Sequence, residues 1–352
     1  MRESESKILV GEILEDIDLV VLLLSVICDR IITYFVLPYF PLHPLTVLPY
    51  VIFAIYYIHG LCKRVQVRTS DKHLPMIFVT GEREVNREQL LSQAEDAIRR
   101  KTGFDKFNAI ERYFLVSLWR SVHWRRMPRS EEEWMDYIED GIERINWLYD
   151  RVMGRKIYHL FLGRPSVMAL GLGAVMGRWE RPPVIVYQWI NDGYKPVLDL
   201  SREPRKIKVR INLSKLNKVD LKYTEVDLPQ SPGSEIALGL EMAGHPIESD
   251  VRRYIQKLGE IEVIIVKNKY RGYLADEDWT EAVQELYSII AELRDRGVEK
   301  LHLFPSMPEA MAFGLGYALG PYWDIKVYNW VREKNTYELV FSLNRLPELS
   351  IE

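Results

Sequence analysis

Two long apolar runs open the chain, and a regular succession of short apolar stretches and amphipathic segments follows them. Residues 17–37 and 45–62 are almost wholly apolar, and between Arg30 and Lys63 there is no Asp, Glu, Lys or Arg. A helix rises about 1.5 Å per residue, so both runs can cross the hydrocarbon core of a bilayer, which is about 30 Å thick. The pattern predicts a two-helix transmembrane hairpin within residues 1–64 and a polar linker at 65–75.

The charges around this hairpin predict its orientation. Basic residues precede the first run at positions 2 and 7 and follow the second at 63, 64 and 68, whereas the connecting loop has none. The positive-inside rule therefore places the hairpin in the inner membrane and both termini in the cytoplasm. Asp29 and Arg30 lie within the first run, where charge is costly. They are expected to face a helix bundle or an aqueous path; an off-centre position, or a buried soluble hairpin, is the alternative.

The rest of the chain contains one unit twice. Residues 157–177 and 300–320 agree without a gap at 10 of 21 positions, including His159 with His302 and Gly173 with Gly316. Each copy has the pattern of a buried strand, a short loop with proline, and a helix rich in glycine and alanine. An internal repeat of this length indicates duplication and predicts two lobes, at 76–205 and 206–352.

Both lobes show the same order of elements. In the first, the apolar pattern predicts strands at 75–81, 110–119, 157–162 and 184–189, with helices near 86–101, 130–153 and 166–177 between them. In the second, strands at 236–242, 261–270, 300–306 and 327–330 alternate with helices near 250–259, 276–297 and 309–320. Residues 206–213 (KIKVRINL) are a candidate extra strand. The alternation predicts an α/β fold of two doubly wound, parallel lobes.

Composition and charge narrow the class of protein. Hydrophobic residues make up 47% of the chain and charged residues 28%, values typical of a folded protein. A net charge of -3 argues against a general polyanion binder. The two cysteines, Cys28 and Cys62, lie in the hairpin and can form neither a zinc site nor a disulfide framework. The soluble part is therefore interpreted as a reduced, cytoplasmic protein without a metal or cofactor.

The motifs of the repeat favour binding over catalysis. The glycines of GLGAVMG at 171–177 fall inside a helix rather than in the turn after a strand, so helix-to-sheet packing is expected of them instead of dinucleotide binding. His159 and His302 lie in the middle of strands and are interpreted as core histidines. The sequence has no H-E-x-x-H, G-x-S-x-G or Walker A motif, and no Cys/His pair in the soluble region. It predicts a binding protein rather than an enzyme.

Candidate ligand contacts follow the strands, at the carboxyl edge where open α/β sheets bind ligands. The repeated loops open helices whose free N–H groups can bind phosphate. A basic, aromatic stretch also follows the second strand of each lobe, at 119–129 and 267–273; Arg and Lys there would neutralise phosphates and rings would stack on bases, a solvated loop being the alternative. The candidates are Gly81, Arg83, Trp119, Arg120, Trp124, Arg125, Gly163, Arg164, Pro165 and Ser166 in the first lobe, and Glu241, Met242, Lys267, Lys269, Pro305, Ser306, Met307 and Glu309 in the second.

The paired motifs HLFLGRPSVMALGLG…VIVYQW and HLFPSMPEAMAFGLG…IKVYNW, each followed by a tyrosine, resemble the SAVED domain, a fusion of two CARF-like halves. The resemblance covers about 76–345. It implies a sensor of a cyclic oligonucleotide, of the cyclic tri- or tetra-adenylate type, in CBASS anti-phage defence or a type III CRISPR pathway, with no duplex nucleic acid as partner. It also implies that ligand drives self-association, which switches on a fused effector. Because the fused element here is the hairpin, the implied output is membrane disruption.

Two alternatives to this receptor stay open: a membrane-tethered hydrolase that degrades a cyclic oligonucleotide, and a membrane scaffold that needs no ligand. The two repeated loops also differ, since one reads Gly-Arg-Pro-Ser and the other Ser-Met-Pro-Glu. Because one loop is basic and the other acidic, we expect an asymmetric pocket. Phosphate contacts should be weighted toward the first lobe and base contacts toward the second.

Overall fold

A computed structural model gives the fold of the chain that follows the predicted hairpin. It describes residues 72–80, 87–103, 123–124, 127–151, 155–163, 165–178, 182–214, 218–270, 274 and 278–346. The chain divides into two units, Met1–Arg68 and Thr69–Glu352, and the described residues all belong to the second. The predicted spans, with Asp29 and Arg30, therefore lie outside the described residues. None of the helices in the described ranges is long and apolar enough to cross a membrane.

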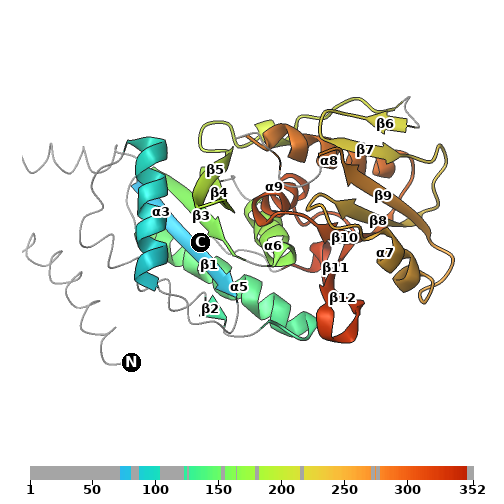
Figure 1. Ribbon diagram of the computed structural model, residues 1–352, viewed down its shortest axis with the longest axis horizontal. Coiled ribbons are helices and arrows are strands. Elements are labelled where there is room, and N and C mark those ends of the chain that lie inside the picture. The colour runs from blue at the N-terminus through green and yellow to red at the C-terminus, as the bar shows by residue number, and fades with distance from the viewer. Residues whose placement is uncertain are drawn as a thin grey trace, which may run out of the picture. The chain divides into compact units, whose positions relative to one another are not determined.

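The first lobe is built on a five-stranded sheet with the order β2-β1-β3-β4-β5 (Figure 1). Strands β1 to β4 run parallel, and β5 returns antiparallel to β4. The strands are β1 (Lys72–Thr80), β2 (His123–Trp124), β3 (Lys156–Leu162), β4 (Val184–Ile190) and β5 (Gly193–Asp199). The described helices between the parallel strands are α3 (Arg87–Thr102), α5 (Glu131–Arg151) and α6 (Ser166–Met176).

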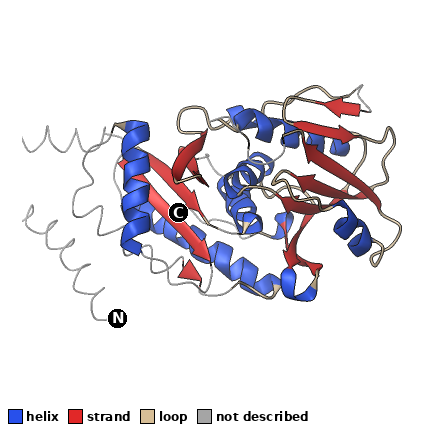
Figure 2. Cartoon of the chain, in the orientation of Figure 1, coloured by secondary structure: helices blue, strands red, loops and turns tan. Residues whose placement is uncertain are grey.

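The second lobe repeats this order within a seven-stranded sheet, β12-β11-β10-β8-β9-β7-β6 (Figure 2). Its five repeated strands are β8 (Glu235–Glu241), β9 (Glu262–Asn268), β10 (Lys300–Ser306), β11 (Ile325–Val331) and β12 (Thr336–Ser342). Its helices are α7 (Glu248–Ile255), α8 (Thr280–Asp295) and α9 (Glu309–Leu319). The hairpin of β6 (Lys218–Asp220) and β7 (Thr224–Asp227) extends the sheet beside β9.

The predicted alternation of strands and helices is confirmed in the described residues, with one difference of topology. Each lobe ends in an antiparallel hairpin, β4–β5 and β11–β12, so the sheets are mixed rather than wholly parallel. The side chain of Ser130 caps α5, because the Glu133 N–H donates to Ser130 Oγ at 3.2 Å. The predicted strand at 110–119 lies outside the described residues.

The prediction of an extra strand at 206–213 is wrong. This connector between the lobes begins with the 3-10 helix η2 (Lys206–Lys208) and then lies along α8. The apolar residues of its alternating pattern are buried beside a helix and not in a sheet. Ile207 and Leu213 are buried, and the Ile211 N–H donates to Ser288 Oγ at 2.9 Å. The strands that do extend the sheet, β6 and β7, come after it in the chain.

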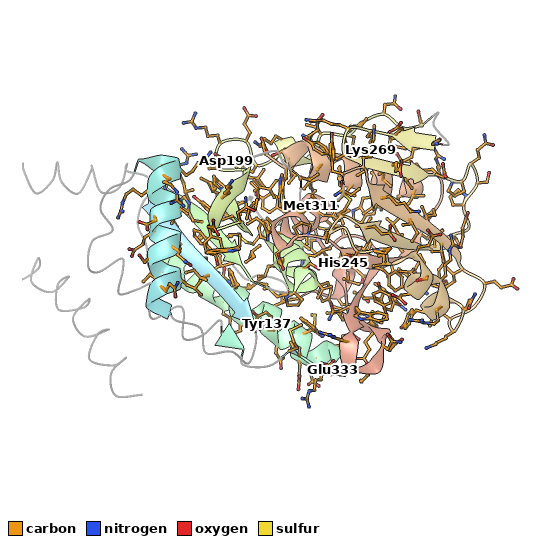
Figure 3. The ribbon with its side chains drawn as sticks, viewed as in Figure 1. Tyr137, Asp199, His245, Lys269, Met311 and Glu333 are labelled. Carbon is orange, nitrogen blue, oxygen red and sulfur yellow. The ribbon has the colours of Figure 1, made fainter. Side chains whose placement is uncertain are left out.

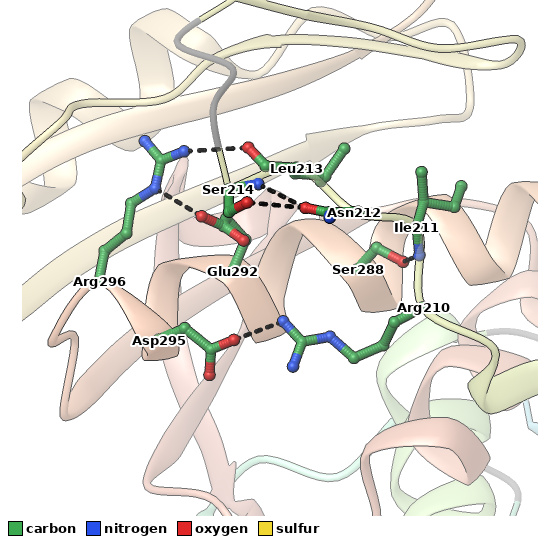
Figure 4. Close-up of polar contacts among 9 residues, drawn as sticks. All are labelled: Arg210, Ile211, Asn212, Leu213, Ser214, Ser288, Glu292, Asp295 and Arg296. Atoms are coloured by element: carbon green, nitrogen blue, oxygen red, sulfur yellow. Dashed lines mark hydrogen bonds and ion pairs between the residues drawn. The ribbon is translucent and has the colours of Figure 1, made fainter.

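A nearly buried ion pair fixes the end of this connector (Figure 4). Arg296 Nε donates to Glu292 Oε1 at 2.9 Å, and both side chains are at most 10% exposed. Its other nitrogens donate to Pro229 O at 2.7 Å and to Leu213 O at 3.3 Å. Arg296 thus satisfies a buried carboxylate and two backbone carbonyls, as a buried charge must if it is to be tolerated.

Ser288→Ala should loosen the connector without disturbing the rest of α8. The change removes the partner of the Ile211 N–H and the hydrogen bond from Ser288 Oγ to Gln284 O, so we expect unfolding to become easier by about 1–2 kcal/mol. Urea unfolding of the full chain measures this. The exposed Ser214→Ala is the matched control and should change stability by less than about 0.5 kcal/mol. Equal effects of the two changes would contradict the role given to Ser288.

One hydrophobic core runs through both lobes. It contains side chains from β1, α5, β3 and α6 of the first lobe and from β8, α8, β10 and α9 of the second. Two smaller clusters lie under α3 and α7, on the sheet faces turned away from this core. Helices α6 and α9 are buried along almost their whole length between the sheets.

The glycines of the repeat allow α6 and α9 to touch backbone to backbone. A Cβ on Gly173 would lie 2.1 Å from Phe313 O, and a Cβ on Gly316 would lie 2.0 Å from Leu170 O. Leu170 and Phe313 occupy the same position in the repeat, so the crossing is symmetric. The prediction that Gly173 packs helix to sheet is therefore wrong, because Gly173 and Gly316 pack helix to helix between the lobes.

Candidate ligand-binding edge

Helices α6 and α9 run in the same direction where they cross, so both begin on one side of the molecule. Beyond their carboxyl ends, the Arg178 guanidinium lies over the ring of Tyr322, 6.0 Å from its centroid. At the start of α9, the Ala310 N–H donates to Gln188 Oε1 at 3.1 Å, and Gln188 lies near the end of β4. Since β4 is parallel to β3, it ends on the side where α6 begins.

We call this side the shared edge: the place where the parallel strands of both lobes end and where α6 and α9 begin. In open α/β sheets, ligands bind outside the carboxyl ends of strands where the chain reverses its order, here between β1 and β3 and between β8 and β10. The candidates that the structure places at this edge are Gly163, Pro165, Ser166, Glu241, Met242, Lys267, Pro305, Ser306, Met307 and Glu309. Two lobes thus present their candidate loops to one side.

The first turn of α6, within Ser166–Met176, carries no acidic side chain of its own. The Gly163 N–H donates to Phe78 O at 2.7 Å, which ties the end of β3 to β1. Pro165 is the N-cap residue, makes no side-chain cap hydrogen bond, and leads into the half-exposed Ser166. The first N–H groups of a helix and its dipole together favour an anion. Arg164, whose charge would add to this, lies outside the described residues.

The start of α9 is closed by a side chain from the other lobe. Gln188 accepts from the Ala310 N–H and donates through Nε2 to Glu309 Oε2 at 3.0 Å. Gln188 therefore caps α9 and holds Glu309 against the first lobe. Sequence reasoning missed Gln188, although the amide that recurs in VYQW and VYNW was a signal for it. The two repeated loops are asymmetric in structure as well as in charge.

Aromatic pairs flank both terminal hairpins at this edge. Trp189 packs edge-on against Tyr194 with centroids 5.0 Å apart, and Trp330 packs against Tyr337 in the same way at 5.1 Å. Burial, together with the carboxylate of Glu309, raises the pKa of Tyr194 to about 12. Trp189 is 40% exposed, yet it follows Gln188 in a strand and so faces the opposite side of the sheet from α9.

Glu241 and Met242 have structural partners in the second lobe. Glu241 Oε1 accepts from the Ile247 N–H at 2.7 Å and from the Glu248 N–H at 3.0 Å, so a carboxylate already occupies the start of α7. Met242 is 1% exposed, and its N–H donates to Ser306 O at 2.7 Å. A phosphate at the start of α7 would have to displace the Glu241 carboxylate.

The remaining candidates of the second lobe differ in exposure. Pro305 and Ser306 are half-exposed at the end of β10, whereas Met307 is 5% exposed and belongs to the core. Their loop therefore offers backbone and the Ser306 hydroxyl to a ligand.

Lys267, near the end of β9, and Lys269, directly after β9, are each paired with a carboxylate. Lys267 Nζ lies 3.2 Å from Glu248 Oε2. Lys269, which is labelled in Figure 3, has its Nζ 2.6 Å from Asp220 Oδ1. Hydrogen bonds to these carboxylates raise the pKa of both lysines. Exposed ion pairs contribute little to stability, so either lysine can exchange its carboxylate for a phosphate.

Most candidates in the first lobe lie outside the described residues. These are Gly81, Arg83, Trp119, Arg120, Arg125 and Arg164. Trp124 belongs to β2, opposite Thr80 at the end of β1, so part of the predicted loop 119–129 is strand. Sequence position alone supports these candidates, and they stay predictions.

The repeated histidines are buried, as predicted, and each bonds a tyrosine from the neighbouring strand. His159 Nδ1 lies 2.9 Å from Tyr187 Oη, and His302 Nδ1 lies 2.7 Å from Tyr328 Oη. The second ring nitrogen of His159 meets His73, whereas that of His302 meets Glu235. Burial lowers the pKa of both histidines, and for His159 burial and the neighbouring His73 lower it to about 3.

The full chain should lose stability as the pH falls below about 6.5. The unfolded chain binds a proton at His159 near pH 6.5, but the folded chain does so only near pH 3. Above pH 6.5 the ring is neutral in both states. Between pH 6.5 and pH 3 a proton binds to the unfolded chain but not to the folded chain, so the free energy of unfolding falls, by about 1–2 kcal/mol at pH 5. Urea unfolding at pH 7.5 and pH 5 measures the difference.

The variant His159→Gln should flatten this pH dependence, because Gln does not titrate. The exposed His245→Gln is the matched control and should keep the slope of the unchanged chain. A slope that is unaltered in His159→Gln would contradict the assignment.

In the described ranges there is no group of three His, Cys, Asp or Glu side chains that could hold a metal ion.

The second lobe is similar to a known family of sensor domains. Residues 208–343 match the model of SAVED, the "SMODS-associated and fused to various effectors sensor domain". This match agrees with the resemblance of the repeated motifs and extends from the connector to the end of β12. No curated protein matches the chain.

Several solved structures are similar to the chain at low sequence identity. The Acinetobacter baumannii Cap4 SAVED/CARF-domain containing receptor with the cyclic trinucleotide 2'3'3'-cAAA gives a TM-score of 0.45 at 16% identity, covering 61% of this chain and 44% of that one. The same receptor with 3'3'3'-cAAA gives 0.44 at 14%, covering 62% and 45%. The Moraxella osloensis Cap4 SAVED/CARF-domain containing receptor gives 0.40 at 14%, covering 62% and 44%. The chain spans less than half of the length of these proteins.

Proposed function

We propose that the two lobes bind a cyclic oligonucleotide at the shared edge and form the sensing part of a membrane-anchored effector of anti-phage defence. The observation that carries the proposal is the match of residues 208–343 to a sensor-domain family, in a chain whose second lobe has a repeated partner. The resemblance of the motifs to SAVED supplies the ligand class, with adenine as the expected base. Parallel crossing of α6 and α9 supports one site shared by both lobes.

The asymmetry of the edge suits a ligand that carries both phosphates and bases. At the start of α6, free N–H groups and the absence of acidic side chains favour a phosphate. At the start of α9, Glu309 repels phosphate but can accept a hydrogen bond from the amino group of a base. The ligand would thus be oriented with phosphates toward the first lobe and a base toward Glu309.

Calorimetric titration of the full chain in detergent micelles tests the sensor. A panel of cyclic di-, tri- and tetranucleotides would include members with and without adenine. Saturable binding of an adenine-containing ring is the expected result. If no ring binds at concentrations up to 1 mM, a dissociation constant weaker than about that value rules out this function for the edge.

The membrane output is the second part of the proposal. The hairpin at 1–64 would anchor the chain, and ligand would favour an oligomer by binding it more tightly than the single chain. In that assembly Asp29 and Arg30 would face one another or an aqueous path. Dye release from liposomes should then need both the ligand and the hairpin. Leakage that is the same with and without ligand would contradict gating.

We also propose that the chain is a receptor and not an enzyme. A receptor returns its ligand intact, whereas a hydrolase linearises it. Chromatography of the bound ring after overnight incubation with the full chain distinguishes the two. Recovery of the intact ring is expected, and a linear product would favour the hydrolase.

A further inference from the structure

The amino edge of the first lobe is basic, and it lies at the opposite ends of the strands from the shared edge. We define it by the segments that meet there: the starts of β1 and β3, the end of α3, and residues 200–205 after β5. We propose that this amino edge is a contact surface for anionic lipid headgroups. The inference rests on the membrane anchoring proposed above, and it adds a second contact between the chain and the bilayer.

Every one of these segments brings basic residues to the edge. The register of β1 and β3 sets Lys72 opposite Lys156, the first residues of two adjacent strands. The basic residues of the edge are Lys72, Arg99, Lys101, Arg155, Lys156, Arg202 and Arg205, and the acidic residues near them are Glu95, Asp96, Asp199 and Glu203.

Contacts among these segments show that they form one surface. Lys101 Nζ, at the end of α3, lies 2.8 Å from Asp199 Oδ2, at the end of β5 (Figure 3). Arg155 Nη2, just before β3, donates to Ser201 O at 2.9 Å. Arg202 and Arg205 follow directly and are exposed. The fold therefore gathers cations from four separated parts of the chain.

The second lobe shows that this charge is not a requirement of the fold. At its corresponding edge, β8 begins at Glu235, Glu299 precedes β10 and Asp324 precedes β11. Glu299 occupies the position of Lys156 in the repeat. Basic residues are also present there, since Lys300 begins β10 and the last turn of α7 carries Arg252 and Arg253, so this edge is mixed in charge, whereas that of the first lobe has an excess of basic residues.

The position of this edge in the chain favours anionic lipid as its binding partner. Strand β1 begins at Lys72, and residues 63–71 connect it to the predicted second span. Nine residues reach at most about 30 Å, so the amino edge is tethered close to the bilayer surface if the hairpin spans it. Clusters of four to eight basic residues beside a span are typical of binding to anionic lipid.

The test uses the full chain in vesicles of phosphatidylcholine alone or with 30% phosphatidylglycerol. A donor dye is attached at Glu203→Cys near the amino edge, or at Glu333→Cys in the β11–β12 turn, with Cys28 and Cys62 replaced by Ser. The acceptor dye is on lipid headgroups. We expect energy transfer at position 203 to rise in the anionic vesicles and to fall again in 0.5 M salt, and transfer at 333 to stay unchanged.

Charge reversal identifies the residues. Arg202→Glu with Arg205→Glu should reduce the lipid-dependent transfer, with docking weakened about fivefold for each arginine removed. The matched control, Lys257→Glu with Arg332→Glu, makes the same charge change at exposed positions of the second lobe and should leave transfer unchanged. Equal transfer in the two kinds of vesicle, or equal effects of the two variants, would overturn the inference.

Flotation of the vesicles distinguishes failure of this inference from failure of the proposed membrane anchor at 1–64. Chain that floats with neutral vesicles but shows no lipid-dependent transfer supports the anchor and overturns the basic edge. Chain that floats only with anionic vesicles, and not after Arg202→Glu with Arg205→Glu, supports the edge and contradicts the anchor. Chain that floats with neither overturns both. Single-stranded RNA that binds the edge without any lipid dependence would also overturn it.

Discussion

Replacing Gly173 or Gly316 with alanine should strongly destabilise the protein, although alanine is the better helix former. In an ordinary helix this change stabilises by about 1 kcal/mol. Here the added methyl carbon would lie 2.1 Å or 2.0 Å from a backbone oxygen of the facing helix, and backbone atoms in a buried helix pair cannot move aside cheaply. We expect a loss of about 3 kcal/mol or more for each variant. Thermal unfolding of the full chain should show a lower midpoint.

The control for this prediction is Gly233→Ala. The nearest atom to a methyl group there is Glu235 O at 3.7 Å, which is ordinary contact. Its effect should stay within about 0.5 kcal/mol. If Gly173→Ala and Gly316→Ala were as stable as Gly233→Ala, the crossing of α6 and α9 could not be as close as described.

Charge reversal at Arg164 should weaken ligand binding far more than Glu309→Gln. Arg164 directly precedes Pro165 and Ser166, where α6 begins without an acidic side chain. A charge-assisted hydrogen bond to phosphate contributes about 1.5–3 kcal/mol, so Arg164→Glu should weaken binding roughly tenfold to a hundredfold. Glu309→Gln keeps the shape and an acceptor oxygen, and it removes a charge that repels phosphate. We expect it to change binding by less than about threefold.

Calorimetry with the ring that binds the unchanged chain measures both variants. Arg202→Glu is the matched control for charge, because it lies at the amino edge, away from the shared edge, and should bind the ring normally. A larger loss for Glu309→Gln than for Arg164→Glu would refute the division into a phosphate side and a base side.

Sequence patterns predicted the elements well wherever local periodicity decides them. In the described residues, strands and helices of both lobes occur near their predicted positions because apolar alternation reports burial directly, while the predicted strand at 110–119 stays a prediction. The pattern could not reveal what buries a segment. Residues 206–213 alternate like a strand, yet Ile207 and Leu213 are buried against helices of the same core. The glycines were placed correctly in helices, but their partner is a helix of the other lobe.

The candidate site shows the same limit. Ends of strands could be located from the sequence, and Pro165, Ser306 and Glu309 lie there. The recurring amide of VYQW and VYNW marks the position of Gln188, but its role could not be predicted, because its partner, the start of α9, is 121 residues away and belongs to the other lobe. Burial of Met242 and Met307 depends equally on packing between distant segments. Contacts of this kind become visible only when the two lobes are seen together.

The close crossing of α6 and α9 has a consequence for where this protein can be divided. The family match at 208–343 covers α9 but not α6, so that segment alone would expose Phe313 and the backbone around Gly316 to water. Neither half is therefore an autonomous folding unit. A chain cut within the connector should yield two fragments that are insoluble apart and recover a native, noncovalent complex when they are refolded together. The boundary of the homologous domain and the boundary of cooperative folding are different in this molecule.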